Sequence, residues 1–140
     1  MRTKSWVFNP RAQKRVIGDR TRASVGLACD RFVERHLRPR FVRPFNPENK
    51  RDPQCTAVHW KWRRHLIYFK ATYRDVLPNA REASYDYSFA RLEYMSGDLF
   101  HLAYLRHTGE WWPLTFGEGN SLEACLKLIR TLPVFEPCVF

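Results

Sequence analysis

Two segments with helical spacing of apolar residues enclose a long stretch in which apolar and polar residues alternate instead. The first helical segment runs from Asp19 to about Leu37 and the second from about Ser121 to Leu132, while much of residues 55–114 has the period of two typical of strands. Helices that flank a run of strands pack on one face of an antiparallel sheet. The sequence therefore predicts an α+β domain with an N-terminal helix, a four- to five-stranded antiparallel sheet and a C-terminal helix.

The first helix has a well-defined apolar face, because its apolar residues recur three or four positions apart. This face comprises Val25, Ala28, Cys29, Phe32, Val33 and His36. The opposite face, expected to face solvent, comprises Asp30, Arg31, Glu34 and Arg35. Pro39 is expected to end the helix, because the residue before a proline disfavours the helical conformation.

Residues 55–73 are predicted to form a pair of strands. Trp60 and Trp62 alternate with Lys61 and Arg63, and alternate residues of a strand point to opposite faces. We therefore expect the two tryptophans in the core and the two cations in an exposed, phosphate-facing row. The less favoured alternative is that the tryptophans stack on nucleic-acid bases while the cations meet the phosphates.

A second hairpin is predicted from residues 85–94 and 99–107. The four residues Met95–Asp98 between them supply the turn, in which Gly97 is free to adopt a positive φ. A short strand over residues 111–114 and a flexible loop over 117–120 are expected to follow. In the last helix the apolar stripe is expected to face the sheet.

We expect two parts along the chain, a basic N-terminal arm over residues 1–18 and a single α+β domain over 19–140. No apolar run approaches the roughly 20 residues of a membrane-spanning helix, and the basic N-terminus lacks the apolar region of a secretory signal. The expected setting is therefore the bacterial cytoplasm, without a membrane partner.

Positive charge is concentrated in the first half of the chain. Residues 1–75 carry 19 Lys and Arg against 6 Asp and Glu, whereas residues 76–140 carry 5 against 8. Arginine predominates, and its planar guanidinium suits phosphate. We therefore predict a non-catalytic nucleic-acid-binding or nucleoprotein-associated module that contacts the phosphate backbone of DNA or RNA. The predicted contact residues are Arg11, Lys14, Arg15, Arg20, Arg22, Arg38, Arg40, Arg43, Lys50, Arg51, Lys61, Arg63 and Arg64.

Two other functions fit the same sequence. In the first, the protein is an interaction subunit of a larger bacterial assembly, with Trp6, Phe8 and the aromatic C-terminus as anchors, because buried aromatic residues dominate interface energies. The C-terminal residues Phe135, Pro137 and Phe140 are also expected to pack back onto the domain. The second, less favoured, function is a small ribonuclease that uses His59 or His65 as a general base.

No complete catalytic, metal or cofactor motif is present. Cys55 and His59 have the spacing of a ligand pair that His65 might join in principle, but a second close pair is missing, so we predict no metal site. The widely spaced cysteines, Cys29 and Cys125 among them, are interpreted as small buried apolar residues. We assign no catalytic residue and no cofactor.

The C-terminal half resembles an uncharacterised bacterial family known only as a domain of unknown function. The resemblance lies in Phe89–Tyr94, Leu102–Arg106 and Gly109–Leu114, followed by a helix start at Ser121–Glu123 and a closing Phe135–Pro137. It covers about residues 85–137. The resemblance implies a fold class and carries no activity or site.

Overall fold

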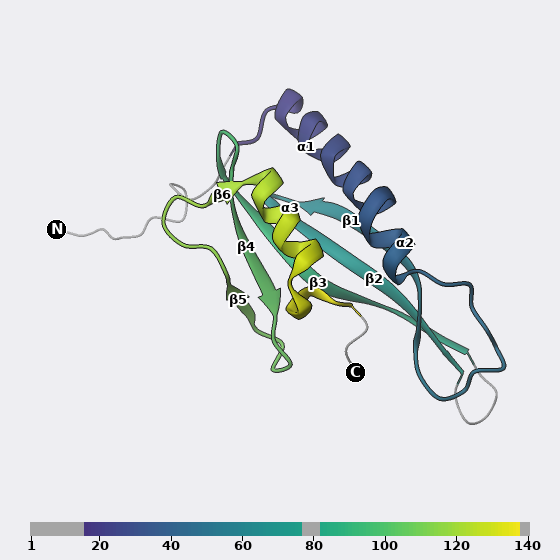
Figure 1. Cartoon of the computed structure of the whole chain (residues 1–140). Coiled ribbons are helices and arrows are strands. Elements are labelled where there is room, and N and C mark those ends of the chain that lie inside the picture. Colours follow the sequence, from purple (N-terminus) through teal and green to yellow (C-terminus); the bar gives the residue numbers. More distant parts are fainter. Residues whose placement is uncertain (1–15, 77–81, 138–140) are drawn as a thin grey trace.

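In the computed structural model, which describes residues 16–76 and 82–137, helices pack on one face of a six-stranded antiparallel sheet (Figure 1). The helices are α1 Asp19–Phe32, the π-helical segment η2 Val33–Leu37, α2 Arg38–Phe41, α3 Leu122–Thr131 and the 3-10 helix η3 Pro133–Phe135. The strands are β1 Gln54–Arg63, β2 Leu66–Val76, β3 Glu82–Ser96, β4 Leu99–Leu105, β5 Trp111–Pro113 and β6 Asn120–Ser121. The predicted α+β class is confirmed. Among the described residues, no helix is both long and apolar enough to cross a membrane.

The first helix continues past the position where the sequence predicted its end. Segments α1, η2 and α2 form one uninterrupted rod from Asp19 to Phe41, and Pro39 lies within its last turn. In regular α-helix the proline ring would clash with the carbonyl four residues earlier. The turn before Pro39 is wider, because the Arg38 amide donates to the carbonyl of Val33, five residues back. The prediction that Pro39 ends the helix was therefore wrong.

The wider turn also changes which residue is buried at the end of the rod. Val25, Cys29, Phe32 and Val33 are buried as predicted, but the next buried position is Leu37. His36, which the spacing placed on the apolar face, is exposed. The extra residue in a π-turn rotates the side chains that follow it, and the sequence pattern gives no sign of this.

The sheet has the strand order β1-β2-β3-β4-β5, and β6 pairs with β4 beside β5. Both predicted hairpins are present, with turns at Arg64 (φ 59°) and Gly97 (φ 54°). Strand β6 exceeds the predicted four or five strands: its two residues pair with Leu99 and Phe100. Two residues are too few to show an alternation, so the sequence predicted only a loop there.

The core lies between the sheet and the helices. The helix-facing sides of β2, β3 and β4 bury residues such as Ile67, Phe69, Leu92 and Leu102. On β1, Trp60 and Trp62 point to the same side, are partly buried and pack against this core. The prediction that the two tryptophans belong to the core is confirmed.

Helix α3 is attached to the sheet at its start and covered by the tail at its end. The hydroxyl of Ser121 accepts a hydrogen bond from the Ala124 amide at 3.1 Å and so caps the helix. The tail folds back as predicted: Phe135 and Pro137 are buried, and Phe135 packs edge-on against Tyr104. Phe140, predicted to do the same, lies outside the described residues.

Candidate nucleic-acid interface

The face of the sheet opposite the helices carries a row of polar and aromatic side chains. Lys61 on β1 lies opposite Tyr68 on β2, and Tyr68 lies opposite Arg91 on β3. These residues alternate with residues buried against the helices, such as Trp60 and Ile67, so their side chains point to the other side. The helices of the described chain all lie on the buried side (Figure 1). We call this helix-free side the open face.

Trp111 lies across this row although it belongs to β5. Its ring meets the ring of Tyr68 edge-on at 5.8 Å, and the guanidinium of Arg91 lies 5.1 Å from the centre of the Trp111 ring. Within the described residues, the buried Nε of Arg91 has no hydrogen-bond partner. The row therefore places two aromatic rings at a steep angle to each other, Tyr68 and Trp111, between a cation of β1 and a cation of β3.

The neighbouring rows of the open face add further cations. Lys70 lies opposite His59 in one adjacent row, and Arg63 lies opposite Leu66 in the other. Rows on the same face are two residues, or about 7 Å, apart along a strand. Lys70, Lys61 and Arg63 therefore form a stripe about 14 Å long. Among the described residues, none of the three forms an ion pair.

The carboxylates of this face already have partners. Asp86 accepts a hydrogen bond of 2.7 Å from the Thr72 hydroxyl and lies 3.7 Å from Nε2 of His59. Glu93 lies 3.0 Å from Nε2 of His65. Among the described residues, the ion pairs of these two acids are with histidines and not with Lys61, Arg63 or Lys70.

Some of the predicted contact residues gather near the β1–β2 turn. Arg22 stacks on Trp62, with its guanidinium 4.7 Å from the ring centre, and donates a hydrogen bond of 3.1 Å to the carbonyl of Arg64. The start of α1 is thereby held at the β1–β2 turn. The structure therefore brings Arg22 and Arg64 together at this turn, on the helical side of β1, while Lys61 and Arg63 point to the open face.

The other described contact residues lie apart from this group. Arg38, Arg40 and Arg43 lie at the far end of the rod, roughly 30 Å from Arg20 by helical rise. Arg38 pairs with Glu34 at 2.9 Å, and Arg43 donates to nearby backbone carbonyls. Lys50 and Arg51 are exposed on the loop that precedes β1. The predicted residues outside the described part of the chain are Arg11, Lys14 and Arg15.

A family model described as a domain of unknown function, DUF3024, matches residues 17–136. The chain belongs to this family. The match confirms the resemblance noted over residues 85–137 and extends it to α1 and to the β1–β2 hairpin. No curated protein and no solved structure matches the chain.

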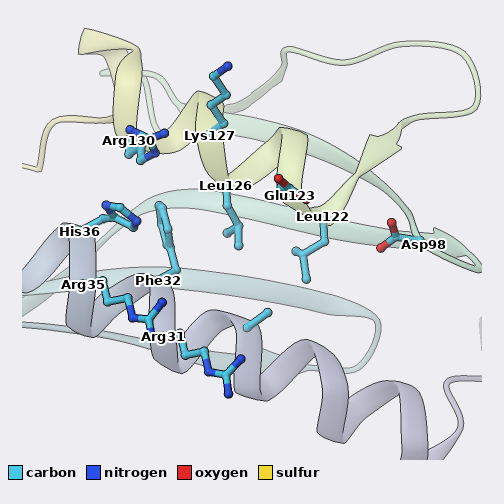
Figure 2. A pocket seen from close by; sticks show the side chains of 11 residues that line it. Arg31, Phe32, Arg35, His36, Asp98, Leu122, Glu123, Leu126, Lys127 and Arg130 are labelled. Carbon is cyan, nitrogen blue, oxygen red and sulfur yellow. The ribbon is translucent and has the colours of Figure 1, made fainter.

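A second basic surface of the DUF3024 domain lies between α1 and α3, on the helical side of the sheet. There a groove of about 700 Å³ has an apolar floor that includes Phe32 and Leu126 (Figure 2). Its basic end contains Arg35, His36 and Arg130, and further along lie Arg31, Lys127 and the carboxylates of Asp98 and Glu123.

Arg31 and Arg35 are exposed, as predicted, and they also flank Phe32 at the edge of the groove. The groove itself could not be predicted from one helix, because α3 supplies the facing wall. One signal was available. Cations at i and i+4 or i+3, as in Arg31 with Arg35 and Lys127 with Arg130, repel each other and weaken a helix. Such pairs indicate a role for the cations other than helix stability.

The histidines of the DUF3024 domain differ in how far their ring nitrogens are engaged. The Thr115 hydroxyl accepts from the Leu102 amide at 2.8 Å, so its proton points to Nδ1 of His101 at 3.0 Å. Nε2 of His101 then donates to the carbonyl of Gly117 at 3.0 Å. Because both nitrogens are used, His101 holds the loop after β5 and is not a free general base.

The cysteines have the environment of apolar core residues. Cys29, Cys55 and Cys125 are buried, as predicted, and burial raises the pKa of Cys29 and of Cys125 to about 12. Cys55 points to the helical side of β1 and His59 to the open face, so the two do not form a ligand pair. Within the described ranges, no three His, Cys, Asp or Glu side chains are grouped to hold a metal ion.

Proposed function

We propose that this DUF3024 domain is a non-catalytic nucleic-acid-binding module of the bacterial cytoplasm that contacts the phosphate backbone of a single strand on its open face. The observation that carries the proposal is the row of Lys61, Tyr68 and Arg91, with Trp111 packed on the last two. The cytoplasmic setting is supported by the free, buried thiols of Cys29 and Cys125.

The physical basis is the pairing of cations with an accessible aromatic surface. Lysine and arginine neutralise phosphates and release their counterions, which supplies most of the affinity and makes it depend on salt. Unpaired bases stack on aromatic rings whatever their sequence, and a duplex keeps the faces of its bases hidden. A stripe of cations beside Tyr68 and Trp111 therefore favours single strands, with little sequence preference.

The test is a salt titration of binding to unrelated single-stranded and duplex oligonucleotides. The double variant Lys61→Ala, Arg63→Ala removes two exposed cations from the stripe, and each lost contact should lower the slope of log affinity against log salt by about 0.7 for a single strand. Replacing Trp111 by Leu should weaken binding about 5- to 150-fold through lost stacking.

A matched control is the double variant Lys50→Ala, Arg51→Ala, which removes the same two residue types from the distant loop. It should leave the slope unchanged. If the unmodified protein binds no oligonucleotide at low salt, the proposal is wrong. An equal loss of slope in both double variants would place the contact surface elsewhere on the protein.

A role as an interaction subunit is the alternative, and one observation favours it. Trp112, on β5, is 47% exposed, and Phe116, in the segment that follows β5, is 75% exposed. By contrast, Phe135 and Pro137 are already buried, and Trp6 and Phe8 lie outside the described residues. A pull-down treated with nuclease separates the two functions, because a protein partner survives the treatment and a nucleic-acid bridge does not.

Ribonuclease chemistry is the remaining alternative, and it depends on His59 or His65. Phosphate contact needs cations and no general base, so replacing either histidine by Ala should leave oligonucleotide binding largely intact. Cleavage of RNA by the unmodified protein that disappears in His59→Ala would establish an enzyme in place of a binding module.

A further inference from the structure

We infer that the groove between α1 and α3 is a separate site for a nucleotide, with the phosphates at its basic end and the base toward its acidic end. This site goes beyond the proposed function, since the groove lies on the opposite side of the sheet from the open face (Figure 2). The inference rests on the charge, the floor and the size of the groove.

The basic end is built from both helices. Arg35 comes from the wider π-turn of the rod, and Arg130 from the last turn of α3. Within the described residues, neither side chain forms an ion pair or a hydrogen bond, although the backbone carbonyl of Arg130 is used by Arg40. Two unpaired guanidinium groups on facing walls offer the forked donors that bind phosphate oxygens in pairs.

The opposite end carries two carboxylates, with Arg31 and Lys127 between it and the basic end. Glu123, Lys127 and Arg130 follow one another at i, i+4 and i+7 on α3, so they share one side of the helix, with Glu123 about 10 Å from Arg130 along its axis. Asp98, from the β3–β4 turn, adds a second carboxylate at the Glu123 end. A nucleotide has a similar length and the complementary order, with anionic phosphates at one end and amino groups on the base at the other.

The floor between the two ends is apolar and the space is sufficient. Ala28, Phe32, Leu122 and Leu126 line it, and a flat base can lie against such side chains. The volume of about 700 Å³ falls within the range of small-molecule sites. A simple anion would use only the basic end, and an apolar ligand would leave the arginines without a partner.

The experiment is calorimetric titration of the full chain at low salt with ADP, adenosine and pyrophosphate. ADP should bind more tightly than either fragment, because only ADP occupies both ends of the groove. Arg35→Ala and Arg130→Ala should each weaken ADP binding by about tenfold or more. Arg20→Ala, on an exposed part of α1 outside the groove, should not.

Several results would overturn the inference. If pyrophosphate binds as tightly as ADP, the groove is a general anion site, and if adenosine does, the arginines hold no phosphate. Absence of ADP binding, or equal weakening by Arg20→Ala, also refutes it. Measuring both ligands with each variant distinguishes the two sites. Arg35→Ala should leave oligonucleotide binding to the open face unchanged. The double variant Lys61→Ala, Arg63→Ala should leave ADP binding unchanged.

Discussion

The indole Nε1 of Trp60 donates a hydrogen bond of 2.8 Å to Oδ1 of Asp30 and so ties β1 to the middle of α1. The same indole lies over Gly26, one helical turn earlier. A Cβ atom at Gly26 would lie 3.3 Å from Cη2 of Trp60, which is tighter than ordinary van der Waals contact. The helix can approach the strand this closely because residue 26 has no side chain.

Replacing Gly26 by Val should therefore destabilise the protein by about 1–3 kcal/mol through overpacking against Trp60. Helix propensity alone predicts the opposite sign, because valine is a better helix former than glycine. Urea unfolding measures the difference. The control is Ala23→Val on the exposed side of α1, which should cost only about 0.5 kcal/mol. A Gly26→Val variant as stable as the unmodified protein would show that Trp60 can move aside.

Arg40 connects the end of the first helical rod to the end of α3. Its guanidinium donates to the Arg130 carbonyl at 2.8 Å and to Oε1 of Glu136 at 3.1 Å. Arg40→Ala should lower the free energy of unfolding by about 1 kcal/mol, because it removes two exposed hydrogen bonds that join segments far apart in the chain. The control is Arg38→Ala, which breaks only the exposed pair with Glu34 and should cost about 0.5 kcal/mol or less. Equal losses in the two variants would contradict a special role for Arg40.

Thr115 is a buried polar residue that supports β4. Its hydroxyl accepts from the Leu102 amide and donates to His101, so Thr115→Val leaves a buried amide without an acceptor. We expect a loss of about 1–3 kcal/mol and faster hydrogen exchange at the Leu102 amide. The same replacement at Thr108, whose hydroxyl is exposed in a turn, should change stability by no more than about 0.5 kcal/mol. Unchanged exchange at Leu102 in Thr115→Val would show that another acceptor replaces the hydroxyl.

Alkylation should modify the buried thiols in the unfolded protein but not in the native protein. Burial disfavours the charged thiolate and raises the pKa of Cys29 from 9.0 to about 12. At pH 8 the thiolate fraction is then about 1 in 10,000, against about 1 in 10 at the ordinary value. Iodoacetamide followed by mass spectrometry should leave Cys29 and Cys125 unmodified in buffer and modify both in urea. Rapid native labelling of either peptide would contradict the buried environment.

The raised pKa values of the buried thiols also determine how the stability of the protein depends on pH in alkaline solution. The native state retains thiol protons that the unfolded state releases near pH 9. The contribution of these two thiols to the free energy of unfolding is therefore complete below that pH, and it is lost as the pH rises toward 12.

The face of a strand or helix that a residue occupies could be predicted from the sequence for most positions, with His36 an exception, whereas the residues that lie next to it on neighbouring elements could not. Alternation placed Trp60 and Lys61 correctly on opposite sides of one strand, and helical spacing identified the stripe of α3. The open face depends on register: nothing local indicates that Tyr68 lies between Lys61 and Arg91, or that Trp111 reaches them from another strand.

Local departures from regular helix and strand geometry could not be predicted from the sequence either. The wider turn before Pro39 and the two-residue strand β6 are each set by a few backbone hydrogen bonds that leave no period in the sequence. The groove was missed for a related reason, because its walls belong to helices that are far apart in the chain, and helical periodicity describes one helix at a time.

Helix α3 is held at both ends by contacts outside the groove that it lines. At its start, β6 pairs with β4, and a Cβ at Gly119 would lie 2.6 Å from the Phe100 carbonyl oxygen, so the backbone fixes the entry of the helix. At its end, Arg40 holds the last turn. The apolar residues that line the groove also belong to the core, because Phe32, Leu122 and Leu126 pack in the cluster of buried residues. Evolution can therefore alter what the groove binds most easily through exposed residues such as Arg35 and Arg130, while the apolar lining keeps the domain folded.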